Sequence, residues 1–279
     1  MSTSGVVNDS RLTFGILPNA YHYGENPASF YTGSFPVYQG ISASTVVSAT
    51  LVSYGSTFGY DDRGYIKSYV ESDAHILTTH NLSIDDSSST DFYFDFEVYY
   101  INAAIGIDPY LFSMYENGNY KLFGRIREDT RYPEITCKLH ASDTQVVVRA
   151  AVPIPLYEFT RVGFRKSGAE FSIYLNGVEV SAYDSTGSIG SIYSYTFTEP
   201  ISVGNPPNIG GEAWYGRIYE ALFFDGSALT SADILDINDS MGSNAFGSLY
   251  GYDNGDSTMS LVFSATGEGR TVDTTIYWT

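Results

Sequence analysis

YEFTRVGFRKSGAEFSIYLNGVEV, at residues 157–180, opens the part of the chain that decides the fold. ISVGN follows at residues 201–205, and WYGRIYEALFFDGSALTSADILDIN follows at residues 214–238. In the first segment, apolar and polar residues alternate on both sides of Asn176-Gly177, a pair that favours a two-residue hairpin turn. The other two segments predict a short strand, a longer strand and then a helix. This order of elements predicts antiparallel β-structure with a helix close behind its last long strand.

Two patterns mark the start of that helix. Thr230 as the N-cap, with Asp233 three residues later, predicts a capping box in which Asp takes the place of the usual Glu. Leu229 and Ile234 have the spacing of a hydrophobic staple. We therefore expect a short helix of roughly two turns after residue 230.

The rest of the chain alternates with the two-residue period of strands, which predicts an all-β sandwich of two antiparallel sheets. The expected strands are 44–54, 64–70, 74–84, 90–101, 111–115, 120–127, 134–139, 145–152, 160–166, 170–175, 201–203, 216–224, 258–265 and 271–278. A second hairpin turn is expected at residues 116–119, where Asn117-Gly118 would supply positive φ angles. No internal repeat is visible.

Three regions differ in composition. Residues 1–44 are rich in Pro, Gly and aromatic residues without clean alternation, which indicates an extended arm whose scattered rings need a partner surface. Residues 45–238 form the expected sandwich. Residues 239–279 read as a loop followed by a two-strand extension. Such an arm could pack on its own domain or on a neighbouring subunit. We favour docking on a sister subunit or a larger scaffold, and we expect a homo-oligomer.

Charge and cysteine content exclude several classes of function. The 279 residues carry 14 basic and 32 acidic side chains, a net charge of −18. Nucleic acids and anionic membrane surfaces are therefore not expected partners. No apolar run reaches the length of a membrane span, and the start of the chain lacks the basic and apolar regions of a secretory signal. The single cysteine, Cys137, excludes an internal disulfide and is expected to be a buried apolar residue.

The ordered patterns resemble the laminin-G-like domains of the concanavalin A-like lectin and glucanase superfamily. Residues 159–164 are similar to the family's "W-x-x-V-A-x-x" strand, with Phe159 or Tyr157 in place of Trp. Residues 171–180 resemble its "lYvdG-x-x-v" hairpin, and residues 201–204 its "l-x-i-G" strand. Trp214-x-Gly-x-Ile218 and residues 229–234 resemble its last strand and helix. Tyr219 stands where the family has Asp.

The resemblance implies a concanavalin A-like jelly roll, a fold that usually binds surfaces and sugars. Sandwich glucanases of the superfamily carry a pattern such as E-x-D-x-x-E, which this sequence lacks. The nearest set is Asp91, Asp95 and Glu97, on one face of the strand expected at 90–101. Residues two apart on a strand lie about 6.5–7 Å apart, within the range of inverting glycosidases. We favour a solvated polar face for these carboxylates over a catalytic pair.

Candidate binding residues lie in loops. Exposed aromatic rings could stack on sugars, and nearby amides could bind hydroxyl groups; the candidates are Tyr215, Asn205, Asn208, Tyr250 and Tyr252. Calcium is common in related folds, and the weak candidates for it are Asp61, Asp62, Asp253 and Asp256. No other cofactor is expected. The four histidines, His22, His75, His80 and His140, lack the spacing of zinc ligands.

The preferred hypothesis is a non-enzymatic structural protein of a phage-like virion, a capsid decoration or tail appendage that displays an adhesion or glycan-binding jelly roll. It would lie on the virion surface and contact cell-surface glycans. The alternatives are a free, extracellular carbohydrate-binding module and a glycoside hydrolase acting on polysaccharide through Asp95 and Glu97. Loss of glycan binding in Tyr215→Ala would favour the first alternative, and loss of turnover in Glu97→Gln the second.

Overall fold

The computed structural model describes residues 11–16, 34–37, 47–52, 58–60, 64–68, 75–77, 80–101, 108–190, 193–204, 216–225, 229–241, 249–253, 258–264 and 271–277. These residues form a sandwich of two antiparallel sheets, and the α-helix among them is α2 (Ser231–Met241). The predicted all-β fold is therefore confirmed. No helix in this described part is long and apolar enough to cross a membrane.

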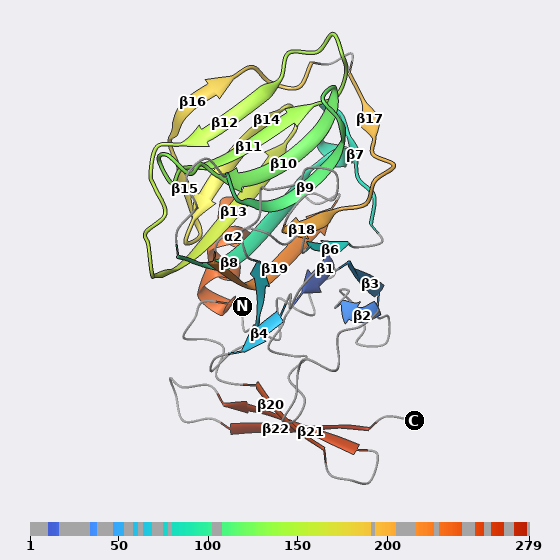
Figure 1. Ribbon diagram of the computed structural model, residues 1–279, viewed down its shortest axis with the longest axis vertical. Coiled ribbons are helices and arrows are strands. Elements are labelled where there is room, and N and C mark those ends of the chain that lie inside the picture. The colour runs from blue at the N-terminus through green and yellow to red at the C-terminus, as the bar shows by residue number, and fades with distance from the viewer. Residues whose placement is uncertain are drawn as a thin grey trace.

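The eight-stranded sheet is built around β8 and β19 at its centre (Figure 1). Its order is β15 (Val178–Val180), β14 (Glu170–Leu175), β13 (Phe159–Ser167), β8 (Phe92–Tyr100), β19 (Gly216–Asp225), β5 (Gly64–Ser68) and β4 (Phe58–Tyr60), and β1 (Leu12–Ile16) also pairs with β19.

The nine-stranded sheet lies opposite. Its order is β16 (Ala182–Thr186), β12 (Val146–Ala150), β11 (Pro133–Lys138), β10 (Tyr120–Ile126), β9 (Tyr110–Asn117), β18 (Ser202–Gly204), β6 (His75–Leu77), β3 (Val47–Val52) and β2 (Ser34–Val37). Two small sheets pair β7 (Ser83–Ile84) with β17 (Tyr195–Thr196), and β20 (Leu249–Asp253), β21 (Thr258–Ser264) and β22 (Thr271–Tyr277) in that order; a 3-10 turn, η3, spans Ser88–Thr90.

The main core fills the space between the two large sheets. Phe94 of β8 stacks on Phe112 of β9 with ring centroids 4.0 Å apart, which joins the sheets at the centre. Close packing explains Gly124, since a Cβ there would lie 2.3 Å from the Phe112 ring. Cys137 is a buried member of this core, as expected, and burial raises the pKa of its thiol. The alternating apolar positions of β8 therefore point inward as predicted.

A second apolar layer covers the other side of the eight-stranded sheet. Leu229, Ile234 and Ile237 of the helix region pack with buried residues of β1, β8, β14 and β19. The predicted capping box is present: Asp233 N donates to Thr230 Oγ1 at 3.1 Å, and Thr230 N donates to Asp233 Oδ2 at 2.8 Å. Leu229 and Ile234 are both buried, as expected of a staple. The helix has 11 residues, about one turn more than expected.

The structure corrects several details of the sequence-based expectations. The strand expected at 74–84 is two separate strands, β6 and β7, in different sheets. The loop expected after residue 239 contains β20. The arm at 1–44 contains β1, which pairs with β19 of the same chain, and β2, which pairs with β3. The boundaries at 44 and 238 stay predictions.

Candidate functional site

The side of the nine-stranded sheet that faces away from the core carries three rows of side chains across β9 to β12. Neighbouring positions such as Phe112, Leu122 and Ile135 belong to the core, so alternation turns these rows outward. The pairing of the strands defines the rows as Tyr115, Lys121 and Lys138; then Ser202, Ser113, Phe123, Thr136 and Val147; then Tyr110, Arg125, Glu134 and Arg149. We call these three rows the outer face.

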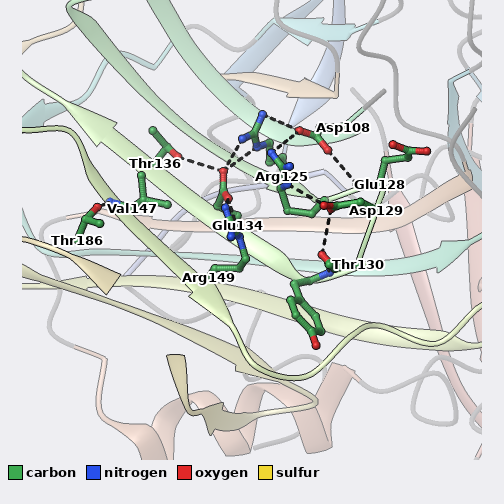
Figure 2. Close-up of polar contacts among 12 residues, drawn as sticks. Asp108, Arg125, Glu128, Asp129, Thr130, Glu134, Thr136, Val147, Arg149 and Thr186 are labelled. Carbon is green, nitrogen blue, oxygen red and sulfur yellow. Dashed lines mark hydrogen bonds and ion pairs between the residues drawn. The ribbon is translucent and has the colours of Figure 1, made fainter. Parts of the chain in front are cut away.

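In the third row, Arg125, Glu134 and Arg149 form a cluster of ion pairs (Figure 2). Arg125 Nε donates to Glu134 Oε1 at 2.8 Å, and Arg149 Nη2 donates to Glu134 Oε2 at 2.6 Å. Arg125 also forms an ion pair with Asp108 at 2.9 Å. Burial acts to raise the pKa of Glu134, but the two guanidinium groups outweigh it and lower the pKa. Glu134 is therefore a fixed anion whose role is to hold three strands together.

The first row differs because its cations face one another. Lys121 of β10 lies directly opposite Lys138 of β11, and both are half-buried. Neither forms an ion pair with a carboxylate in the part of the chain that the structure describes. Burial and then the charges of Lys138 and Arg125 lower the pKa of Lys121. The Lys121 ammonium lies 5.9 Å from the ring centroid of Phe123, so this ring of the second row stabilises the ammonium through a cation–π contact.

Four rings gather where β10 and β11 meet the loop around β17. Tyr120 stacks on Tyr195 with centroids 4.2 Å apart, and His140 stacks on Tyr193 at 5.5 Å. Tyr120 and His140 meet edge to face at 6.4 Å, which joins the two pairs. We call these residues the ring cluster. It is partly exposed, and it adjoins the first row in sequence, because Tyr120 precedes Lys121 and His140 follows Lys138 by two residues.

Hydrogen bonds anchor the ring cluster to the β9 end of the sheet. The Tyr195 hydroxyl donates to Glu116, and this bond raises the pKa of Tyr195 to about 12. Glu116 also accepts from the Thr198 hydroxyl at 2.9 Å. Burial acts to raise the pKa of Glu116, but these hydrogen bonds lower it overall. The position of Tyr195 in the ring cluster is therefore held by its hydrogen bond to Glu116.

The carboxylates considered for hydrolysis lie on the other sheet. Asp91, Asp95 and Glu97 were expected to line a solvated polar face, and this is wrong: each is at most 2% exposed. The sequence showed that they share a face but not that further elements cover it. Asp95 pairs with Arg161 and accepts from the Tyr93 hydroxyl at 2.7 Å. Arg161 also donates to Glu220 at 2.8 Å. Because both side chains are buried and Asp95 is paired with Arg161, Asp95 and Glu97 do not form an accessible acid–base pair.

The other candidate residues cannot be compared with this geometry. Asn205, Asn208, Tyr215, Asp61, Asp62 and Asp256 lie outside the described residues. Tyr250, Tyr252 and Asp253 lie on β20, whose side chains are not described. Within the described part, no group of three or more His, Cys, Asp or Glu side chains is arranged to hold a metal ion. His80 contacts Asp225 at 3.0 Å.

The outer face and the ring cluster were missed in the sequence. The pattern KLFGR at residues 121–125 does show Lys, Phe and Arg on one side of a strand. What it does not show is the strand register that places Lys138 opposite Lys121, or the return of residues 193–195 to Tyr120. Both depend on contacts between distant parts of the chain.

No protein-family model matches the chain, and no curated protein sequence matches it. Among solved structures, the chain is similar to Trypanosoma rangeli sialidase, with a TM-score of 0.55 and 11% identity over 85% of this chain and 34% of that one. It is also similar to domain 4 of AbnA, a GH43 extracellular arabinanase from Geobacillus stearothermophilus, in complex with arabinotriose. That match has a TM-score of 0.54 and 15% identity over 82% of this chain and 98% of that domain. The chain thus spans about a third of the length of the sialidase.

These similarities contradict the prediction that the chain is not an enzyme. Two of the matched structures belong to proteins named as enzymes: the match covers 34% of a sialidase, and the other matched chain is domain 4 of an arabinanase. The missing double-Glu strand is therefore no ground for excluding catalysis. The similarity to these structures agrees with the predicted all-β fold, while the concanavalin A-like superfamily and the finer laminin-G-like assignment stay predictions. At 11% and 15% identity, the matches show the fold alone, an all-β sandwich.

Proposed function

We propose that the chain binds carbohydrate, and that the ring cluster together with the first row of the outer face forms the binding surface. Sugars present flat apolar faces and hydroxyl edges, and they are held by aromatic rings flanked by polar groups. The observation that carries the proposal is the column of rings formed by Tyr195, Tyr120, His140 and Tyr193, which is exposed at His140 and partly exposed elsewhere; Lys121 directly follows Tyr120 in the chain.

The structural similarity supports the same function. Domain 4 of the arabinanase has this fold over nearly its whole length, and it was solved with arabinotriose. The sialidase is likewise a protein that acts on a glycan. A fold used by such proteins favours carbohydrate as the ligand, although the identity is too low to transfer a sugar type or a site.

A glycan array followed by calorimetry tests this proposal. We expect saturable binding that Tyr193→Ala and His140→Ala each weaken at least about fivefold, since an aromatic contact is worth on the order of 1 kcal/mol. Tyr183→Ala is the matched control, because Tyr183 is 68% exposed on β16 and its ring lies 5.8 Å from that of Tyr132, outside the ring cluster. An array without binding, or equal loss in the control, would overturn the proposal. Release of reducing sugar should be measured on every glycan that binds.

The role in a virion has less support. Its basis is the sequence alone, in particular the composition, the aromatic arm and the resemblance to an adhesion fold, and so the virion surface location and the docking of residues 1–44 on sister subunits stay predictions. The oligomeric state of the purified protein tests the predicted docking on sister subunits.

A further inference from the structure

We propose that the outer face selects glycans that carry an anionic group, a carboxylate or a sulfate ester, and that this group lies between Lys121 and Lys138. The inference rests on the proposed function and names the class of sugar.

Charge is distributed unevenly along the chain. Residues 121–149 hold 6 of the 14 basic residues and 4 of the 32 acidic ones, a net charge of +2. The remaining 8 basic and 28 acidic residues give −20. The net charge of −18 argues against polyanions as partners. The region of strands β10 to β12, however, has a positive net charge. A local reversal of sign in an acidic protein marks a surface where an anion is attracted while the rest of the molecule repels it.

The strand register makes the lysine pair unfavourable without a ligand. Like charges directly opposite each other on neighbouring strands destabilise a sheet, and here both are also half-buried. No described carboxylate forms an ion pair with either lysine, and the charges that act most on Lys121 are those of Lys138 and Arg125, both positive. Such an arrangement costs stability, which is typical of binding sites rather than of scaffolds.

The arginines of the face do not serve this role. Arg125 is engaged by Glu134 and Asp108, and Arg149 by Glu134. The donors that stay available for a ligand are therefore the two ammonium groups, each with three N–H bonds. A compact anion can accept from both, and the ring cluster, whose Tyr120 precedes Lys121 and whose His140 follows Lys138 by two residues, is the part that would hold the sugar. The surface thus fits an acidic saccharide better than a neutral one.

Calorimetry with matched ligands tests this inference. Suitable pairs are sialyllactose against lactose, and oligogalacturonate against its methyl ester, with a sulfated disaccharide as a third anion. We expect the anionic member of at least one pair to bind at least tenfold more tightly, and its affinity to fall as salt rises. Lys121→Gln and Lys138→Gln should each remove that preference. Arg165→Gln, the same charge change on the eight-stranded sheet, should leave it unchanged.

Thermal unfolding separates a binding role from a structural one. Because the lysines repel each other, the Lys121→Gln protein should be at least as stable as the wild type while it loses affinity. Equal binding of neutral and anionic members, or unchanged affinity in both lysine variants, overturns the charge selection and leaves the proposed function standing. If no glycan binds, both the charge selection and the proposed function are overturned. Equally tight binding of a DNA oligonucleotide overturns selection of a glycan.

Discussion

The two Asn-Gly turns hold glycine in different backbone conformations. At Asn176-Gly177 both residues have positive φ, 49° and 78°, and Leu175 pairs with Val178, as a two-residue hairpin requires. At Asn117-Gly118 neither residue has positive φ, which corrects the expectation for that turn. Instead the Asn117 side chain accepts from Asn119 N at 2.9 Å, and the register shifts after Tyr120. A bulge takes up the twist there.

Alanine at the two glycines should therefore have unequal effects. Gly177→Ala should cost about 1–2 kcal/mol or more, because of its positive φ and because its Cβ would lie 2.7 Å from the Asn238 side chain. Gly118→Ala is the matched control, with nothing within 4 Å of the new Cβ, and should change stability by less than about 0.5 kcal/mol. Urea unfolding measures both. Equal losses would contradict the turn assignment.

Asp233 in the helix cap makes the stability of the protein depend on pH. Hydrogen bonds from Arg11 and Thr230 lower the pKa of Asp233 from 3.8 to about 2. Since the folded pKa lies below the unfolded one, the stabilisation is complete above about pH 4 and is lost as pH falls through 2. Asp233→Asn should cost about 1 kcal/mol at pH 7, and the difference from wild type should shrink towards pH 2. Asp236→Asn, at an exposed position on the same helix, should show neither effect.

Among the elements, β8 is buried on both faces, as is its neighbour β19. Its apolar face was predicted from alternation alone, because Phe92, Phe94 and Phe96 recur every second residue. The burial of its polar face could not be predicted, because α2, far away in sequence, packs on that side of the sheet. Arg161 supplies the positive charge that balances the buried carboxylates. Burial would lower the pKa of Arg161, but the charges of Asp95 and Glu220 outweigh the effect of burial and raise the pKa.

Removal of that arginine tests the buried polar face. Arg161→Gln leaves two carboxylates buried without their cation, so we expect a loss of about 3–5 kcal/mol in the free energy of unfolding. Arg165→Gln, four residues along the same strand and half-buried, should cost less than about 1 kcal/mol. Chemical denaturation at pH 7 distinguishes them. Similar small losses would mean that water reaches Asp95 and Glu220 after all.

At the scale of the whole molecule, local signals predicted the class of fold but not the candidate site. The hairpin at 176–177, the capping box at Thr230 and the alternation of β8 each depend on residues close in sequence, and each was found. The lysine pair depends on the register between β10 and β11, and the ring cluster depends on a loop that returns from β17 to β10. Such long-range geometry is set by packing of the entire sandwich, which a single sequence does not display.

The first strand ties the N-terminal region to its own sandwich. Leu12 is buried, Thr13 Oγ1 accepts from Asp225 N at 2.9 Å, and Arg11 pairs with Asp233 at 3.1 Å. A chain that lacks residues 1–16 should therefore lose at least about 3 kcal/mol of stability, since it exposes the edge of β19 and an apolar cluster. A chain that lacks residues 1–8 keeps β1 and serves as the control. Light scattering on both also tests the predicted docking on sister subunits: if only the longer deletion changes oligomeric state, unfolding is the cause. If the shorter one dissociates an oligomer at unchanged stability, the start of the chain contacts a neighbour.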